Sequence, residues 1–294
     1  MTIPGVVVAA YRRHYDVALD SGETLACVLK GRSLRIAVGD RVEVEHAKEG
    51  GAIAAVSPRT NLVYRSDAFK EKLVAANVTQ VAAVVAPDIG LDEELIHRWM
   101  IAAEAARARY VIFANKSDLP SFATLRTRLA PFDALGYAIV PLAAKHDAAA
   151  VATWLAGQHT VLVGQSGMGK STLINALVPD AKARTTEVSD SLKAGRHTTS
   201  STTLYRLPQF GPDTWIVDSP GMKVFGLAHV DPDALTAAFV ELRPLIGHCR
   251  FRDCRHDAEP GCAITAAVQD GRVARNRLAL LHTLRREREA TSRY

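Results

Sequence analysis

The feature that most constrains the fold is a glycine-rich stretch at residues 164–172, which reads GQSGMGKST. A β-rich apolar run at 160–163 precedes it, and a helix-like run at 172–177 follows it. A strand, a glycine-rich turn and a helix in this order form the context of a P-loop. The glycines let backbone N–H groups turn around a phosphate, and the helix N-terminus adds its positive dipole end. A structural glycine-rich turn is the alternative, but the complete GxxxxGKS pattern in this context favours a nucleotide phosphate site.

The polar residues of this stretch have distinct expected roles. We expect Lys170 to reach the β- and γ-phosphates as a catalytic group, and the Ser171 hydroxyl to ligate Mg²⁺. The predicted phosphate-binding residues are Gly164, Gln165, Ser166, Gly167, Met168, Gly169, Lys170, Ser171 and Thr172.

A second motif, NKxD, follows the apolar strand-like run at 110–114. The Asp118 carboxylate can accept the N1–H and the 2-amino group of guanine, a pair of donors that adenine lacks. We expect Asn115 to support the loop and the purine edge, and Lys116 to lie along the ring. An NKSD string also occurs in ordinary turns, but after a strand in a P-loop chain it indicates GTP. The expected guanine-site residues are Asn115, Lys116, Ser117 and Asp118, with backbone contacts from Ala143, Ala144 and Lys145.

A DxxG motif, DSPG, begins at Asp218 after a third strand-like run. Asp218 is expected to hold Mg²⁺ through water, and the Gly221 N–H to meet the γ-phosphate. Between the P-loop and DxxG lies the polar stretch GRHTT. We expect Thr199 to ligate Mg²⁺ when GTP is bound, with Thr198 as the alternative.

The residue after DxxG is Met222, whose side chain cannot orient the attacking water as a glutamine at this position does in many GTPases. His197 in the GRHTT stretch is the candidate catalytic group that replaces it, and a group supplied by a partner is the alternative.

The motifs stand in an unusual order, because NKxD precedes the P-loop in the chain. An ordinary small GTPase has the P-loop first and NKxD last. The same sheet can be built in this order if the chain is circularly permuted. The segment after DxxG then leads directly into the C-terminal part of the chain.

The N-terminal residues 1–56 read as short strands at 6–8, 24–29, 42–44 and 53–56. Short strands with turn signals predict a small barrel, for which an OB-fold is the natural match in size and a small β-sandwich the alternative. Cys27 lies in a strand pattern and is expected to be a buried apolar residue. Residues 57–77 lose the pattern and are interpreted as a linker.

From residue 78 the pattern alternates between strands and helices. Strands are predicted at 81–86, 110–114, 137–142 and 160–163, and helices at 91–108, 121–135 and 146–155. This alternation predicts a parallel sheet covered on both faces. Strands at 202–207 and 214–217 complete the domain at 78–230. Helices are predicted at 231–246 and from 263 to the end, in a third domain at 231–294.

Cys249, Cys254, His256 and Cys262 cluster within fourteen residues. Three thiolates and one imidazole suit a closed, tetrahedral, structural Zn²⁺ site. Free buried cysteines are the alternative to a metal site, and His248 is the alternative fourth ligand.

The composition sets wider limits. The 294 residues allow two or three domains, and 48% apolar with 23% charged residues indicates a globular chain. We find no membrane span and no signal peptide, so we expect a cytoplasmic protein. The net charge of +5 permits a polyanionic partner. Arginines from 272 to the end favour an RNA-phosphate surface over a plain solvated helix face.

The order NKSD, GQSGMGKS, GRHTT, DSPG and C-x4-C-x-H-x5-C resembles the circularly permuted ribosome small-subunit-dependent GTPase A family over nearly the whole chain. The family's HTTT stretch reads HTTS here, with Ser200 third, and the N-terminus lacks a long basic extension. The resemblance implies an OB-fold, a permuted P-loop GTPase domain and a helical zinc-binding domain. It also implies GTP hydrolysis, stimulated by the small ribosomal subunit, in late maturation of that subunit.

The expected partners are therefore the small subunit with its rRNA, and GTP or GDP, with one structural Zn²⁺ per chain and Mg²⁺ bound with GTP. We expect a monomer without a membrane partner. Two other functions stay open from the residues: a permuted GTPase acting on the large subunit or the membrane, and an RNA-binding module whose hydrolysis is incidental.

Overall fold

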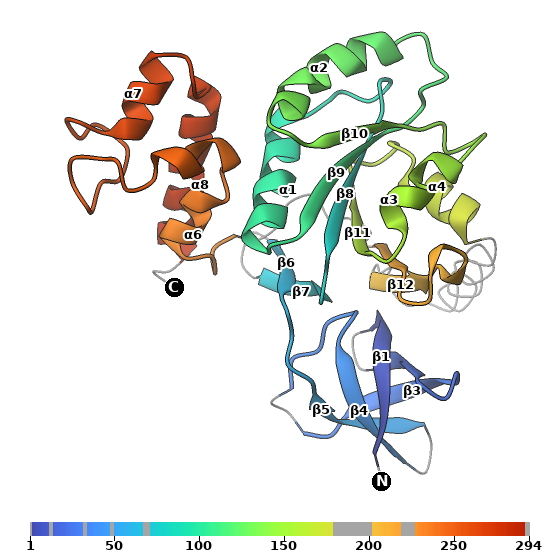
Figure 1. The fold of residues 1–294 in the computed structure, drawn as a ribbon. Coiled ribbons are helices and arrows are strands. Elements are labelled where there is room, and N and C mark those ends of the chain that lie inside the picture. The colour runs from blue at the N-terminus through green and yellow to red at the C-terminus, as the bar shows by residue number, and fades with distance from the viewer. Residues whose placement is uncertain are drawn as a thin grey trace.

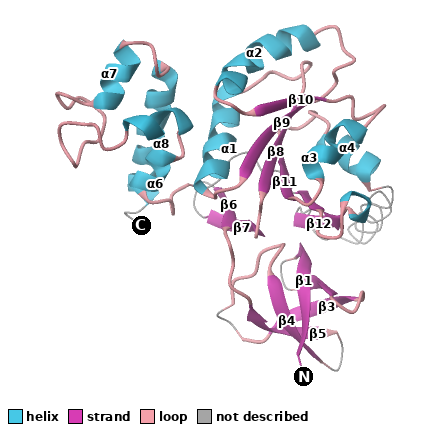
Figure 2. Cartoon of the chain, viewed as in Figure 1, coloured by secondary structure: helices cyan, strands magenta, loops and turns pink. Residues whose placement is uncertain are grey.

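The computed structural model describes residues 2–11, 14–31, 34–47, 50–66, 71–178, 202–218 and 227–291. These residues form a small β-barrel at the N-terminus, a central sheet flanked by helices, and a helical module that lies beside helix α1 (Glu93–Ala105) (Figure 1, Figure 2). The predicted multidomain α/β architecture is confirmed.

The N-terminal barrel closes on itself. Its strands pair in the order β1-β2-β3-β5-β4, and β4 pairs back onto β1. β3 and β5 run parallel, whereas β1 is antiparallel to both of its barrel neighbours. A closed five-stranded barrel of this order is the OB arrangement, so the β-sandwich alternative is excluded. The strands are β1 (Thr2–Ala10), β2 (Tyr15–Leu19), β3 (Thr24–Leu29), β4 (Arg41–His46) and β5 (Gly51–Val56).

Inward-facing apolar residues fill the barrel, among them Val7, Val17, Val44 and Ile53. Cys27 is 1% exposed, as its strand pattern predicts. Burial, followed by the charge of Asp16, raises the pKa of its thiol to about 11. The sequence pattern did not indicate β2, which follows a polar and basic run at 11–14.

The segment interpreted as a linker contains an antiparallel hairpin, β6 (Leu62–Ser66) and β7 (Glu71–Ala76). Charged residues interrupt the apolar alternation of this segment and conceal the strands in the sequence. Asn61 ties the hairpin to the rest of the chain, because its Nδ2 donates to the carbonyl oxygens of Val78 at 2.7 Å and Ala106 at 2.9 Å.

An ion pair with a buried carboxylate stabilises the point where the chain leaves the barrel. The guanidinium of Arg59 donates to both carboxylate oxygens of Asp40, at 2.6 Å and 2.7 Å, and Asp40 is fully buried. The Asp40 carboxylate also accepts from the Ala37 N–H at 2.7 Å. A buried carboxylate needs such partners, so Arg59 joins the start of the connecting segment to the barrel.

The central sheet has the strand order β10-β9-β8-β11-β13-β12. The first five strands are parallel, and β12 is antiparallel to β13. β8 lies in the middle and every one of its residues is buried, as expected for a strand with both faces covered. The strands are β8 (Gln80–Val85), β9 (Arg109–Ala114), β10 (Ala138–Pro141), β11 (His159–Val163), β12 (Thr202–Arg206) and β13 (Trp215–Asp218).

Helices α1 and α2 lie on one side of this sheet, and α3 and α4 on the other (Figure 1). Their bounds are α1 (Glu93–Ala105), α2 (Phe122–Ala134), α3 (Ala152–Leu155) and α4 (Lys170–Leu177). The Asp92 side chain caps α1 by accepting from the Leu95 N–H at 3.0 Å. The helix predicted at 146–155 is shorter than expected, since a 3₁₀ turn at Ala149–Val151 precedes α3. No helix among the described residues combines the length and apolar character needed to cross a bilayer.

The barrel joins the central sheet through β1. Ala9 and Ala10 of β1 pair with Thr203 and Thr202 of β12. Thr203 in turn pairs with Asp218 of β13. The barrel is therefore hydrogen-bonded to the strand that neighbours the first residue of DxxG.

The C-terminal module contains α6 (Pro232–Ala237), α7 (Ala263–Gln269) and α8 (Arg275–Thr291). The helix predicted at 231–246 breaks into α6 and a 3₁₀ helix at Val240–Leu245, which contains Pro244. The single helix predicted from 263 onward is interrupted between α7 and α8, where Gly271 has φ +74°. Leu235, Phe239 and Leu281 form the core of the module, and Ile101 of α1 packs into it.

A polar seam docks the module on α1. Arg277 donates to Glu241 at 2.5 Å and to the Nδ1 of His97 at 3.1 Å, and its exposed fraction is 3%. Burial removes Arg277 from the phosphate-binding surface expected for the tail, whereas Arg272, Arg275 and Arg286 are exposed. A bidentate pair between Arg98 and Glu287, both contacts at 2.8 Å, continues the seam at its edge.

This seam predicts an acid-sensitive step in unfolding. Burial, followed by the charge of Arg277, lowers the pKa of His97 to about 4. Arginine can only donate, so Nδ1 of the neutral ring accepts. Because the unfolded histidine titrates near 6.5, its contribution to stability is complete above that pH. It is lost as the pH falls toward 4, by up to about 3 kcal/mol.

We expect His97→Asn, which keeps a hydrogen-bond acceptor but cannot titrate, to lack this pH-dependent loss of stability. Urea unfolding of the parent and the variant between pH 7 and pH 4 measures it as the difference between their unfolding free energies. Equal pH slopes in the two proteins would contradict the assignment.

Candidate functional site

The predicted motifs meet at one edge of the central sheet. β9, β8, β11 and β13 are adjacent parallel strands, so their carboxyl ends lie together. NKSD follows β9, the glycine-rich stretch follows β11, and Asp218 ends β13. In open parallel sheets this edge is where ligands bind.

The glycine-rich loop has a backbone that only glycine adopts freely. Gly164, Gly167 and Gly169 have φ of +150°, +83° and +101°. A Cβ at Gly164 would lie 2.5 Å from the carbonyl oxygen of Val84. Helix α4 begins directly after Gly169, so its free N–H groups point toward the loop. The loop therefore has the form of an anion-binding nest.

Lys170 lies folded over this loop. Its ammonium donates to the carbonyl oxygens of Gly164 at 2.5 Å and Gln165 at 3.0 Å. Burial lowers the pKa of Lys170, and the charge of Asp218 opposes that shift. Burial likewise raises the pKa of Asp218, opposed by Lys170. The two charged groups thus interact across the site, and both are poorly solvated.

Asn115 joins three of the predicted segments. Its exposed fraction is 3%, its Nδ2 donates to the Met168 carbonyl at 2.9 Å, and its Oδ1 accepts from the Ala144 N–H at 3.0 Å. The Met168 side chain is buried, with its sulfur 3.2 Å from the Ala86 N–H, so Met168 can offer only its backbone to a ligand. A Cβ at Gly169 would overlap the Asn115 amide.

The Lys116 and Asp118 side chains are more exposed than that of Asn115. The Asp118 side chain is 44% exposed, and the Nε2 of His146 lies 3.7 Å from its carboxylate. The Ser117 N–H donates to the Leu142 carbonyl at 3.0 Å, which ties this loop to the end of β10. The Ala143 carbonyl accepts from the backbone N–H groups of His146 and Asp147, so residues 143–147 form a tight turn beside Asp118.

Asp88 is a residue of this site that the sequence analysis missed. It lies in the loop after β8, and its carboxylate contacts the Lys116 ammonium at 2.5 Å. No motif marks it. The signal that identifies it is topological: β8 lies between β9 and β11, so its loop must lie between NKSD and the P-loop.

Several predicted residues lie outside the described part of the chain, namely His197, Thr198, Thr199, Gly221 and Met222.

Cys249, Cys254, His256 and Cys262 form a second candidate site in the C-terminal module. Their ligand atoms all lie within 4.8 Å of one another. The Nδ1 of His256 lies 3.5 Å from Cys249 Sγ and 3.6 Å from Cys262 Sγ, and these two sulfurs are 4.0 Å apart. A tetrahedral metal with bonds of about 2.3 Å to sulfur and about 2.0 Å to nitrogen needs separations of about 3.5–3.8 Å. The four residues therefore fit a bound metal, and His248 is not among them.

The surrounding backbone supports this cluster. The Thr265 N–H donates to Cys262 Sγ at 3.4 Å at the start of α7. His282 of α8 lies with its Nε2 2.9 Å from the carbonyl oxygen of His256, whose φ is +64°. Burial, followed by the charge of Arg285, lowers the pKa of His256, which favours the neutral ring that ligates metals.

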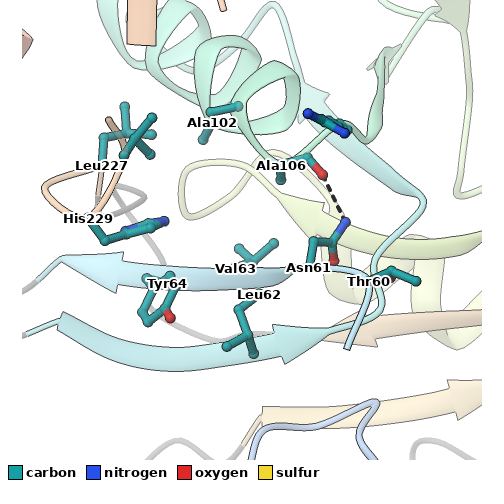
Figure 3. A pocket seen from close by; sticks show the side chains of 12 residues that line it. Thr60, Asn61, Leu62, Val63, Tyr64, Ala102, Ala106, Leu227 and His229 are labelled. Atoms are coloured by element: carbon teal, nitrogen blue, oxygen red, sulfur yellow. Dashed lines mark hydrogen bonds between the residues drawn. The ribbon is translucent and has the colours of Figure 1, made fainter. Parts of the chain in front are cut away.

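A separate cavity of about 340 Å³ lies where β6, the end of α1 and residues 227–230 meet. Figure 3 shows Tyr64 and His229 side by side at this cavity, and their ring centroids are 4.2 Å apart. Asn61, which binds the Ala106 carbonyl, borders it. The cavity is lined by the hairpin, α1 and the segment that leads into the C-terminal module, and not by the phosphate loop.

Comparison with known proteins agrees with this geometry. The sequence profile of the RsgA GTPase family, described as "RsgA GTPase", matches residues 56–228. The chain is 48% identical to the "Small ribosomal subunit biogenesis GTPase RsgA" of Burkholderia pseudomallei (strain K96243), covering 94% of this chain and 89% of the relative. It is 46% identical to the protein of the same name from Nitrosospira multiformis, covering 95% of this chain and 89% of the relative.

Two solved structures share the fold. "YjeQ from Thermotoga maritima" has a TM-score of 0.70 at 28% identity, covering 98% of this chain and 99% of that one. "YloQ, a circularly permuted GTPase" has a TM-score of 0.69 at 22% identity, covering 99% and 96%.

The contact between Gly169 and Asn115 yields a prediction. In Gly169→Ala the new Cβ would displace the Asn115 amide, which would release the Met168 carbonyl and the Ala144 N–H. We expect nucleotide affinity, measured with a fluorescent GDP, to fall by at least about tenfold. This is the cost of losing the two buried, uncharged hydrogen bonds of Asn115.

Gly157→Ala is the matched control, because Gly157 also has positive φ, at +66°, but a Cβ there meets nothing within 4 Å. It adds backbone strain without touching the site. Equal loss of affinity in both variants would show that strain, and not Asn115, controls binding.

Proposed function

Because the chain belongs to the RsgA GTPase family, we propose that it hydrolyses GTP as an assembly factor in late maturation of the small ribosomal subunit. The names of its relatives support this role. The observation that carries the proposal is Asn115, whose amide joins NKSD to the P-loop at 2.9 Å and to residues 143–145 at 3.0 Å. A base pocket and a phosphate loop joined in this way suit one guanine nucleotide.

In this proposal the Asp118 carboxylate accepts the two guanine donors, and the stem of Lys116 lies along the purine ring. The phosphates occupy the loop at 164–172. Lys170, now bonded to loop carbonyls, turns to the β- and γ-phosphates when they arrive, since a phosphate is a stronger partner for an ammonium than a carbonyl. The Gly221 N–H would meet the γ-phosphate.

The oxygen donors suit Mg²⁺, which would neutralise phosphate charge. Ser171 is exposed in the first turn of α4, and the Asp218 carboxylate interacts electrostatically with Lys170. Hard oxygen ligands of this kind are those that Mg²⁺ prefers. We assign Ser171 and Thr199 as its protein ligands, with Asp218 acting through water and Thr198 as the alternative to Thr199.

We propose that the Cys249, Cys254, His256 and Cys262 cluster holds a structural zinc ion. Three thiolates and a neutral imidazole, gathered within 4.8 Å of one another, are a donor set that zinc prefers. We propose four segments for the chain: an OB-fold at 1–56, a linker at 57–77 that includes the hairpin, the permuted GTPase domain at 78–230 and the zinc-binding domain at 231–294.

The proposed partner is the small subunit with its rRNA. The closed barrel and the exposed arginines Arg272, Arg275 and Arg286 support RNA contact, because OB barrels bind oligonucleotides and arginines pair with phosphates. A role in ribosome assembly is consistent with a cytoplasmic location.

The zinc assignment predicts one zinc ion per chain in protein purified without chelators, measured by elemental analysis. Cys254→Ser should lose the metal and unfold the C-terminal module, because metal binding supplies much of the folding free energy of such a module. Cys27→Ala is the control, since Cys27 lies in the barrel. A parent protein without zinc, or with another metal, would overturn the assignment.

The proposed function predicts slow GTP turnover by the isolated chain, because Met222 cannot orient the attacking water. Small subunits should accelerate single-turnover hydrolysis by roughly 10³- to 10⁵-fold, as partner-supplied groups do elsewhere. His197→Ala should keep GTP affinity and lose most of this acceleration. Full stimulation of His197→Ala would move the water-orienting role to the partner. Equal rates for the parent with and without small subunits would overturn the proposed function.

A further inference from the structure

We propose that Asp88 is a positioning residue for guanine, which acts by holding the Lys116 side chain in place beside the purine site. The inference rests on the proposed function, since Lys116 has this task only if the edge of the sheet binds a purine nucleotide. It assigns a role to a residue that belongs to none of the sequence motifs.

The topology puts Asp88 between the two halves of the site. β8 pairs with β9 on one side and with β11 on the other, so the loop after β8 lies between NKSD and the P-loop. This loop touches the P-loop twice. The Ala86 N–H contacts the sulfur of Met168 at 3.2 Å, and a Cβ on Gly167 would lie 3.1 Å from Cδ1 of Ile89.

The Lys116 ammonium has two partners in this space. It donates to Asp88 Oδ2 at 2.5 Å and to the Gly167 carbonyl at 3.0 Å. The hydrogen bond from Lys116 is the largest cause that lowers the pKa of the Asp88 carboxyl, so the carboxylate is ionised at neutral pH. Among the described residues, Asp88 is therefore the only acidic residue that forms an ion pair with Lys116.

The need for such a partner follows from the lysine itself. The Lys116 side chain is 28% exposed, and its backbone is left-handed at φ +58°, a conformation that L-residues rarely adopt. A lysine side chain has four rotatable bonds and loses up to about 2 kcal/mol of conformational entropy when it is ordered. An anchor at the ammonium orders the stem before the nucleotide arrives, and preorganisation of this kind increases affinity.

The role also predicts what Asp88 does not do. Its carboxylate is occupied by Lys116 and does not read the 2-amino group of the base, which is the task proposed for Asp118. Loss of Asp88 should therefore weaken binding of guanine and hypoxanthine nucleotides by the same factor. The ratio of the two affinities separates the positioning role from a general collapse of the pocket.

The test measures affinities of the intact chain for GDP and inosine diphosphate by competition with a fluorescent GDP. Asp88→Ala should weaken both by about five- to tenfold, as expected for one partly exposed, charge-assisted contact, and leave their ratio unchanged. Asp88→Asn, which keeps an acceptor for the ammonium, should lose about twofold or less. Thermal unfolding without nucleotide should match the parent in both variants.

Two controls isolate the path through Lys116. Glu93→Ala removes a carboxylate that pairs with Arg128 at 3.0 Å at the start of α1, and it should leave both affinities at the parent values. In a Lys116→Met background, Asp88→Ala should cause no further loss, because contacting residues that act as one unit are not additive.

The outcomes are distinguishable. A parent chain that binds neither nucleotide overturns the proposed function and this role with it. A parent that binds GDP while Asp88→Ala binds equally well overturns the role of Asp88 alone. A full loss from Asp88→Ala in the Lys116→Met background, or a changed GDP to inosine diphosphate ratio, also overturns it.

Discussion

The parallel pairing of β9, β8, β11 and β13 is the constraint on which the rest of the structure depends. Parallel strands align their carboxyl ends, and here those ends bear the NKSD loop, Asp88, the glycine-rich loop and Asp218. These strands are rich in valine, alanine and isoleucine, and their side chains are mostly buried, as expected for a parallel sheet with both faces covered. The order of the motifs along the chain is thus free to change, provided that the strand order in space is kept.

The two outer parts of the chain attach to this sheet at different places. The barrel joins at β12, where the pairs Ala9 with Thr203 and Thr203 with Asp218 form a continuous ladder. The C-terminal module joins at α1, through the polar seam of Arg277, Glu241 and His97 (Figure 1). α1 follows directly after the loop that bears Asp88. The barrel is therefore connected through β12 to Asp218, and the C-terminal module is connected through α1 to the loop that bears Asp88.

Much of this arrangement could be predicted from the sequence. The strands of the central sheet are continuous apolar runs, and the motifs that follow them carry strong chemical signatures, so their positions agree within a few residues. β2 and the β6–β7 hairpin escaped prediction because polar and basic residues interrupt their alternation. The C-terminal helices are shorter than predicted. Pro244 lies in a 3₁₀ helix and not in an extension of α6, and the left-handed Gly271 follows the end of α7; helical periodicity alone reveals neither.

The residues that sequence reasoning missed are those whose role depends on tertiary contact. Asp88 has no motif, and it reaches Lys116 only because β8 lies between β9 and β11. Arg277 resembles any other tail arginine in the sequence, yet it is buried against Glu241. Spacing along the chain contains no information on such pairs, because their partners are 28 and 36 positions away.

The central claim is that this edge of the sheet binds a nucleotide and selects guanine. Competition between GDP and ADP for the intact chain, in the presence of Mg²⁺, tests it most directly. The account predicts that GDP binds at least about 100-fold more tightly, because a carboxylate that accepts two base donors is left unpaired by adenine. Equal affinities for GDP and ADP would contradict it.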